Sequence, residues 1–141
     1  TIVFAESCTG GLIGNRLTNV SGSSDVFKGG LVAYSDESKI EILGVSNDIL
    51  DQDGSVSKKA ALSMAENVKN LFNSSIGLSV TGIAGPGGAT KEKPVGLVYV
   101  GLSTNSDTVA KKFYFGKNRK RNKIKTSQMA LEVLRKGLLS E

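Results

Sequence analysis

The stretch AESCTGG, residues 5–11, carries a hydroxyl and a thiol directly behind the apolar run of residues 2–4. A turn from a buried strand into a helix would present Ser7 at the end of a sheet, where open α/β folds bind ligands. It would also place the backbone N–H groups of residues 8–10 beside a helix N-terminus, facing a developing oxyanion or a phosphate. The chemistry indicated is nucleophilic attack by Ser7. The alternative is a serine or threonine helix cap with glycines for tight packing.

The base for such a nucleophile must be lysine, aspartate, glutamate or tyrosine, because the chain contains no histidine. This absence excludes Ser-His-Asp and Cys-His catalysis on this chain and the common histidine-bearing zinc sites. Lys39 is our candidate, since AYSDESK ends a strand at Tyr34 and puts Lys39 in the first turn of the next helix. The helix dipole and burial would both lower the pKa of that amine, and Tyr34 would relay or donate the proton. The alternative is a surface lysine on an amphipathic helix.

A glycine-rich loop, TGIAGPGG at residues 81–88, follows another apolar run, which is the sequence context of a phosphate or ribose cradle. The loop lacks the last glycine of a dinucleotide-binding fingerprint and the Gly-Lys-Ser/Thr ending of a P-loop. It therefore indicates either a ligand-binding segment or a wide turn without a ligand.

Two other reactive groups have simpler explanations. Ser55 and Lys58 match a serine-x-x-lysine spacing, but Ser57 between them is better explained as the cap of a long helix. Cys8 is the only cysteine and has no histidine to activate it, so we expect a small buried thiol and no internal disulfide.

The net charge of +5 is concentrated in one segment. Residues 117–125, KNRKRNKIK, hold six basic side chains and no acidic one, which leaves 12 basic and 13 acidic residues elsewhere. This segment opens the predicted last helix, where positive charge is unfavourable, so an anionic partner is one interpretation and a solvated face is the other. Without aromatic residues among the basic ones it has no stacking platform, and we do not expect nucleic acid as a partner.

Hydrophobic patterns predict the elements that position these residues. Strands are expected at 1–5, 30–35, 76–82, 95–103 and 108–115, and helices at 10–20, 36–43, from Ser57 to about 72, and at 119–138. On the last helix, the expected inner stripe is Ile124, Leu131, Leu134 and Leu138. Strands separated by helices, with a late hairpin, predict one α/β domain over residues 1–141 with helices layered on a mixed sheet.

The composition, with 39% apolar and 22% charged residues, is that of an ordinary globular protein. No run of about eighteen apolar residues and no secretion signal is visible, so we expect a cytoplasmic protein without a membrane anchor. The chain starts inside a predicted strand, at Thr1 and without an initiator methionine, which suggests that a preceding segment has been removed or left out.

The motifs AESCTGG, GSS, GGLVAYSDESK, LGV, GSVS, TGIAGPGG and EKPVGLVYV follow one another along the chain. In this order and at these intervals they resemble the CinA C-terminal domain family, whose enzymatic members are nicotinamide-nucleotide amidases. The resemblance covers nearly the whole chain and implies a three-layer α/β/α sandwich with a mixed sheet that associates as a homodimer. The full CinA protein adds an N-terminal nucleotide-pyrophosphatase-type domain, which this sequence does not contain.

The resemblance also implies roles for individual residues. The family's serine nucleophile falls on Ser7, its lysine base on Lys39 and its assisting tyrosine on Tyr34. The arginine of its GDR motif matches Arg119 loosely, because this sequence reads GKNR, with an extra residue and no aspartate. The implied substrate-binding residues are Cys8, Thr9, Gly10, Gly11, Thr81, Gly82, Ile83, Ala84, Gly85, Pro86, Gly87 and Arg119.

The reaction implied is hydrolysis of nicotinamide mononucleotide to nicotinate mononucleotide and ammonia, through an acyl-enzyme on Ser7. No metal and no organic cofactor is expected, and the partner is a small pyridine nucleotide. The alternative is a catalytically silent nucleotide-binding or regulatory module of a competence/damage-inducible CinA-like protein. A nucleic-acid accessory role would rest only on residues 117–125.

Overall fold

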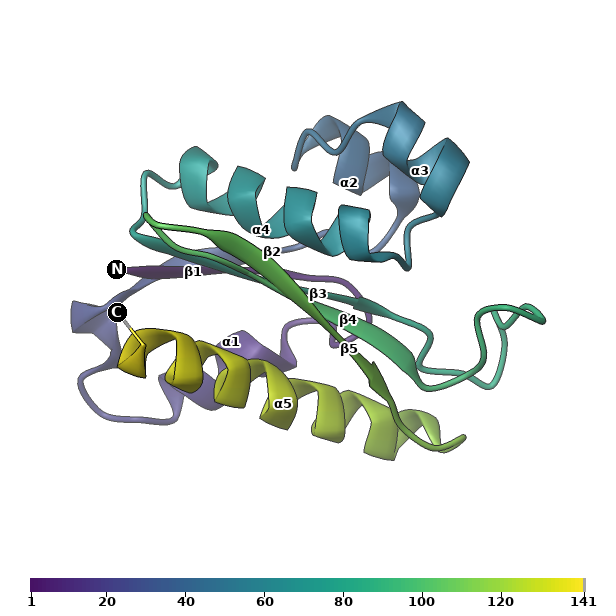
Figure 1. Cartoon of the computed structure of the whole chain (residues 1–141). Coiled ribbons are helices and arrows are strands. Elements are labelled where there is room, and N and C mark those ends of the chain that lie inside the picture. Colours follow the sequence, from purple (N-terminus) through teal and green to yellow (C-terminus); the bar gives the residue numbers. More distant parts are fainter. Residues whose placement is uncertain (141) are drawn as a thin grey trace.

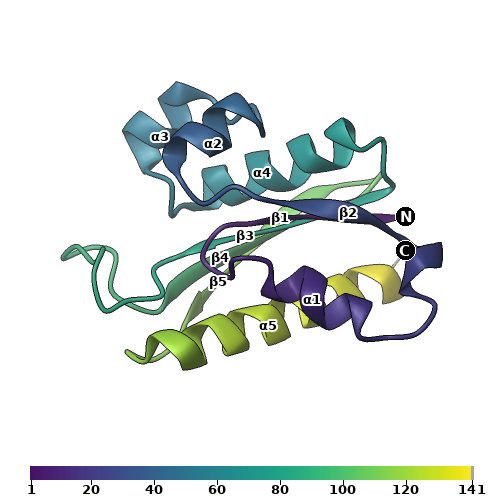
Figure 2. The same cartoon turned by 180° about the vertical axis from the view of Figure 1, so that it is seen from behind.

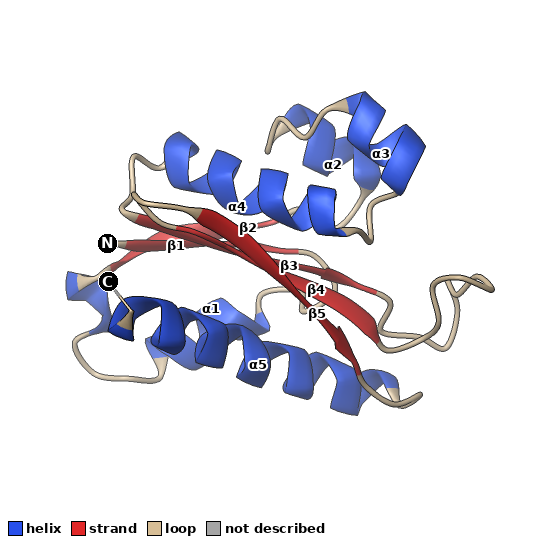
Figure 3. Ribbon diagram, in the orientation of Figure 1, coloured by secondary structure: helices blue, strands red, loops and turns tan. Residues whose placement is uncertain are grey.

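A mixed sheet of five strands forms the centre of the protein, of which the computed structural model describes residues 1–140 (Figure 1, Figure 3). The strands are β1 (Ile2–Glu6), β2 (Phe27–Val32), β3 (Ile76–Gly82), β4 (Leu97–Ser103) and β5 (Thr108–Tyr114). Their order across the sheet is β2-β1-β3-β4-β5. β1 is parallel to both of its neighbours, β2 and β3, whereas β3 with β4 and β4 with β5 are antiparallel.

Helices cover both faces of this sheet (Figure 1, Figure 2). The long α4 (Lys58–Leu71) lies on one face with the shorter α2 (Asp36–Glu41) and α3 (Asn47–Asp53). The other face is covered by α1 (Leu12–Thr18) and α5 (Arg119–Leu139), and a 3-10 turn, η1, spans Ser23–Asp25. The predicted three-layer α/β/α sandwich with a mixed sheet is confirmed. Within residues 1–140, no helix combines the length and the apolar character needed to cross a membrane.

Each face of the sheet has its own hydrophobic core, because alternate side chains of a strand point to opposite faces. Phe4 of β1 belongs to the core beneath α5, together with Leu134 of that helix. Val3 and Ala5 belong to the opposite core, beneath α4, together with Met64. Since both faces are covered, β1 is buried at every position, which explains why its sequence shows no polar alternation.

Serine caps begin the helices on the α4 face. The predicted cap at Ser57 is confirmed, since its Oγ accepts a hydrogen bond from a first-turn N–H of α4, and Ser35 caps α2 in the same way. The sequence pattern does not predict α3, which is capped by Ser46. Only Ile49 and Leu50 of this helix are apolar, and two residues are too few to establish a helical period.

The second strand lies three residues earlier than predicted, at 27–32 instead of 30–35. The ring of Phe27 packs against that of Phe4, with centroids 4.9 Å apart, and this contact extends the strand at its start. The strand ends at Val32 because residues 33–35 leave the sheet to begin α2.

The inward face of α5 is more polar than the hydrophobic pattern predicts. Leu134 is buried as expected, but Ile124 and Leu138 are 55% and 46% exposed, so the predicted stripe is wrong at these two positions. Asn122 is buried instead, and its Nδ2 donates to the carbonyl oxygen of Ala84 at 3.0 Å. Its Nδ2 also donates to the carbonyl oxygen of Gly116 at 2.8 Å, whereas its Oδ1 has no hydrogen-bond partner within residues 1–140. A pattern of apolar residues cannot reveal such a buried amide.

Candidate active site

The carboxyl ends of three parallel strands meet at one edge of the sheet. β1 runs beside β2 and β3 in the same direction, so the residues that follow Glu6, Val32 and Gly82 emerge together. A cavity of about 270 Å³ opens at this edge, between these segments and the start of α5. This is the position at which open α/β sheets bind ligands.

Most of the site residues expected from the sequence line this cavity, namely Ser7, Cys8, Tyr34, Lys39, Thr81, Gly82, Ile83, Ala84, Gly85, Gly87 and Arg119. Thr9, Gly10, Gly11 and Pro86 are not among its lining residues. The lining also includes four residues that the sequence reasoning missed: Asp36, Ser55, Val56 and Gly88. Asp36 lies between two predicted residues in AYSDESK, and that proximity was the one signal that could have identified it.

The amine of Lys39 is buried at the cavity, with the residue only 2% exposed. Its Nζ donates to the backbone carbonyl oxygen of Tyr34 at 3.1 Å and lies 4.0 Å from Oδ1 of Asp36. Burial lowers the pKa of Lys39 from its ordinary value, because the protonated form is poorly solvated there, and the Asp36 carboxylate acts in the opposite direction. The lysine therefore has the environment that a neutral amine base requires.

The phenol of Tyr34 is held by Arg119. Nη2 of Arg119 donates to the Tyr34 hydroxyl at 2.9 Å, while Nη1 donates to the carbonyl oxygen of Gly85 at 2.6 Å. One guanidinium thus joins the segment after β2, the glycine-rich loop and the start of α5. Because the phenol oxygen accepts from Arg119, its own proton is available to a group in the cavity.

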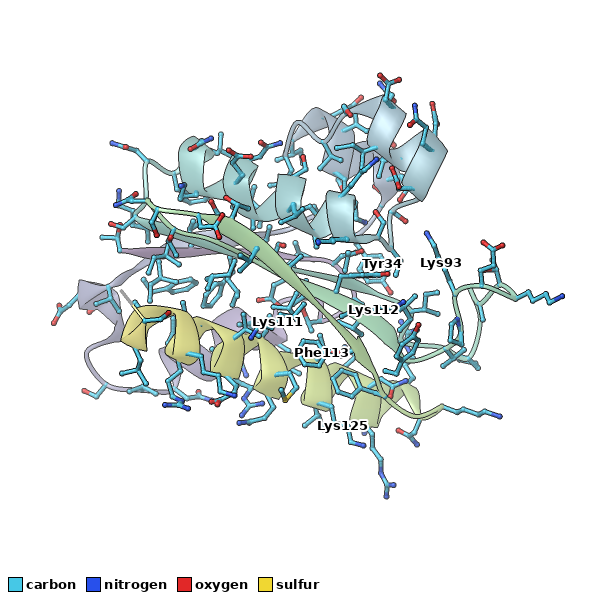
Figure 4. All side chains as sticks on the ribbon, viewed as in Figure 1. Tyr34, Lys93, Lys111, Lys112, Phe113 and Lys125 are labelled. Atoms are coloured by element: carbon cyan, nitrogen blue, oxygen red, sulfur yellow. The ribbon has the colours of Figure 1, made fainter. Side chains whose placement is uncertain are left out.

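The segment that follows the glycine-rich loop forms a hydrogen bond with the helix layer that contains α3. Nζ of Lys93 donates to the backbone carbonyl of Asp53 at the end of α3. Figure 4 shows Tyr34 and Lys93 toward the same end of the molecule. Arg119 therefore holds the glycine-rich loop at Gly85, and Lys93 holds the segment that follows this loop against the end of α3.

The N-terminus of α1 is occupied by a carboxylate of the chain itself. Glu6 is 3% exposed, and its oxygens accept hydrogen bonds from the Thr9 hydroxyl and from the N–H groups of Gly11, Ile13 and Gly14, at 2.5 to 3.1 Å. The sequence predicts that this helix N-terminus faces an oxyanion or a phosphate. Of the N–H groups of residues 8–10 expected to face such a group, that of Gly10 donates to the carbonyl oxygen of Ser7 at 3.0 Å, which corrects the expectation at this position. The N–H groups that follow, of Gly11, Ile13 and Gly14, hold Glu6 instead of a ligand.

Replacing Glu6 should destabilise the turn that carries Ser7. The Glu6 carboxylate accepts four hydrogen bonds. Glu6→Gln removes its charge and replaces one of its two acceptor oxygens with an NH2 group, which would then face N–H donors. Losing charged hydrogen bonds in a buried site costs about 2–3 kcal/mol, to be measured as the free energy of unfolding in urea. Glu66→Gln, the same change at an exposed position of α4, is the control and should leave the free energy of unfolding unchanged. Equal stabilities of the two variants would contradict this role of Glu6.

Cys8 lines the cavity as a neutral thiol. Burial raises its pKa to about 12, so the thiolate is scarce at neutral pH and the sulfur is a poor nucleophile. The expected small buried thiol is confirmed. Within residues 1–140 its backbone N–H donates to no other residue, which leaves it available to an oxyanion on a ligand.

Ser55 lines the cavity and is held there by β3, because Oγ1 of Thr81 in that strand donates to the carbonyl oxygen of Ser55 at 2.6 Å. Lys58 is exposed and is not a lining residue. The spacing of Ser55 and Lys58 therefore does not form a second serine and lysine pair in this cavity.

The sequence of the chain matches the family described as CinA C-terminal domain over residues 1–138. It is 51% identical over 140 residues to a CinA-like protein of Dictyoglomus thermophilum and 47% identical over 139 residues to one of Kosmotoga olearia. Each match covers 99% of this chain and 34% of the relative, so the chain spans about a third of the length of these curated relatives. The fold of this chain is similar to that in the crystal structure of the competence/damage inducible protein CihA from Agrobacterium tumefaciens. The TM-score is 0.92 at 39% sequence identity, and the match covers 95% of this chain and 82% of that one.

Proposed function

Because the chain belongs to the CinA C-terminal domain family, we propose that it hydrolyses the carboxamide of nicotinamide mononucleotide to nicotinate mononucleotide and ammonia. The observation that supports this proposal most strongly is the cavity shared by Ser7, Lys39 and Tyr34, with the lysine amine buried. A serine hydroxyl and an amine of lowered pKa that line one cavity are a suitable pair for acyl transfer in a chain without histidine.

In the proposed reaction Lys39 begins as the neutral amine. It takes the hydroxyl proton of Ser7 as Oγ bonds to the carboxamide carbon, and the π electrons of the C=O bond move to its oxygen. The N–H of Cys8 stabilises that oxyanion. As the C=O bond re-forms, the C–N bond breaks and ammonia leaves with the proton that Lys39 carries, either directly or through Tyr34, which is then reprotonated by Lys39, so that Lys39 is neutral again. Water attacks the acyl-enzyme while Lys39 takes one of its protons; the bond from the carbonyl carbon to Ser7 Oγ breaks, Lys39 returns the proton to Oγ, and nicotinate mononucleotide leaves.

The charges of the cavity support a substrate of this class. Nicotinamide mononucleotide combines a pyridinium cation with a phosphate, and the cavity offers the carboxylate of Asp36 and the guanidinium of Arg119. The pyridinium also withdraws electrons from its own carboxamide, which reduces the barrier that the protein must lower. No metal or organic cofactor takes part in this mechanism.

The direct test is incubation of the purified chain with nicotinamide mononucleotide, followed by assays of ammonia and of nicotinate mononucleotide. We expect both products in equal amounts at a rate well above that of the uncatalysed reaction. Binding of the nucleotide without release of either product would overturn the amidase proposal and identify a catalytically silent nucleotide-binding module.

The pH dependence of kcat should respond to Asp36. Its carboxylate raises the pKa of Lys39, so Asp36→Asn should lower that pKa further and leave more neutral amine at a given pH. The acid limb of the profile of kcat against pH is then displaced to lower pH, by a small amount because Asp36 is exposed to solvent. Glu37→Gln, an exposed neighbour outside the cavity lining, is the control and should leave the profile unchanged. An acid limb of Asp36→Asn that moves to higher pH would contradict Lys39 as the base.

A further inference from the structure

The phosphate of the proposed substrate needs a cationic site, and the glycine turn after β1 does not provide it. The N–H groups of Gly11, Ile13 and Gly14 all donate to the Glu6 carboxylate. A phosphate placed there would compete with these bonds and would face a buried negative charge. The phosphate must therefore be bound by other groups beside the cavity.

The basic face of α5 offers such groups. Arg119, at the start of α5, lines the cavity, and its two terminal nitrogens donate to neutral acceptors, the oxygens of Gly85 and Tyr34. Within residues 1–140, no carboxylate forms an ion pair with Arg119 or Lys123. Lys123 follows Arg119 by four residues, so both side chains emerge on the same face of the helix.

Lys123 reaches the turn that carries the proposed nucleophile. A Cβ built on Gly10 would lie 4.0 Å from Nζ of Lys123, so the ammonium lies directly over that turn. The same charge counteracts part of the increase that burial causes in the pKa of Cys8, the residue after Ser7. Lys123 is half-buried, and the three N–H bonds of its ammonium are suited to the oxygens of a phosphate.

We propose that Lys123, with Arg119 beside it, binds the phosphate monoester of the substrate at the α5 side of the cavity. This inference rests on the proposed function, and it names the residue that would make the site prefer a nucleotide to the corresponding nucleoside.

Lys125 provides a matched control on the same helix. It carries the same charge two residues further along the chain but is exposed, and Figure 4 shows its side chain pointing away from the sheet. Lys123→Ala and Lys125→Ala change the net charge equally. A difference between them therefore reports the position of Lys123 and not the overall electrostatic field.

The test compares nicotinamide mononucleotide with nicotinamide riboside, which lacks the phosphate. For Lys123→Ala we expect kcat/KM for the mononucleotide to fall roughly 10- to 100-fold, mainly through KM, with kcat/KM for the riboside unchanged. Lys123→Arg should restore most of the preference, and Lys125→Ala should behave like the wild type. Equal losses with both substrates, or no loss with either, would overturn the assignment of Lys123.

Binding measurements separate this inference from the proposed function. If the wild-type chain releases no ammonia from either compound, the amidase proposal fails, but calorimetric titration still tests the phosphate site. The affinity for the mononucleotide should then be weaker in Lys123→Ala than in Lys125→Ala, with the affinity for the riboside equal in both. Equal affinities of the two variants for the mononucleotide would overturn the inference whether or not the chain is an enzyme.

Discussion

Ser7→Ala is expected to abolish turnover of nicotinamide mononucleotide, with kcat lowered by roughly four to six orders of magnitude. The substitution removes the oxygen that would form the acyl-enzyme, and the neighbouring thiol of Cys8 cannot replace it because burial raises the pKa of Cys8 to about 12. The dissociation constant of the substrate should change little, since the other lining residues remain. Single-turnover assays of ammonia release and a binding titration measure the two quantities separately.

Ser55→Ala is the matched control for Ser7→Ala. Both serines line the same cavity, but the contact that the structure gives Ser55 is made by its backbone carbonyl, with the hydroxyl of Thr81 as donor. Removing the Ser55 hydroxyl should therefore leave kcat within a few-fold of the wild-type value. Ammonia release by Ser7→Ala at a rate close to that of Ser55→Ala would eliminate Ser7 as the nucleophile.

Lys39→Met is expected to lower kcat by roughly three orders of magnitude or more while the protein remains folded. Methionine retains the length and apolar stem of lysine but cannot accept the Ser7 proton. Burial disfavours the protonated amine, so replacing it with an apolar side chain should also raise the free energy of unfolding. A variant that loses kcat while its free energy of unfolding rises cannot have lost activity through misfolding.

The pH dependence of stability provides a second measurement on Lys39. Its pKa is lowered in the folded state, so the unfolded chain binds more protons between the folded and unfolded pKa values. Stability therefore rises with pH through that window and is lost as the pH falls through it. Lys39→Met should remove this contribution, and urea unfolding of both proteins over neutral to alkaline pH measures it. A wild-type chain whose stability falls as the pH rises through this window, relative to Lys39→Met, would contradict a buried amine of lowered pKa.

Local sequence was sufficient for several elements of the fold. The third strand occupies residues 76–82 as predicted, because a short run of apolar and small residues leading into a glycine-rich segment indicates a buried strand. The cap at Ser57 depends on a side chain bonding a backbone N–H three residues later, which is a local interaction. The motifs around Ser7 and Lys39 also indicated two segments that the parallel strands then bring to one edge of the sheet.

The α/β architecture and the segments that carry Ser7, Tyr34 and Lys39 were therefore predictable, since the helix and strand patterns of each element are local. The position of Lys123 over Gly10 depends on α5 packing against α1, two segments that are far apart in the chain. The burial that lowers the pKa of Lys39 also comes from packing against distant segments. Burial, charge pairing and polar satisfaction depend on which residues become neighbours in space, and spacing along the chain does not contain that information.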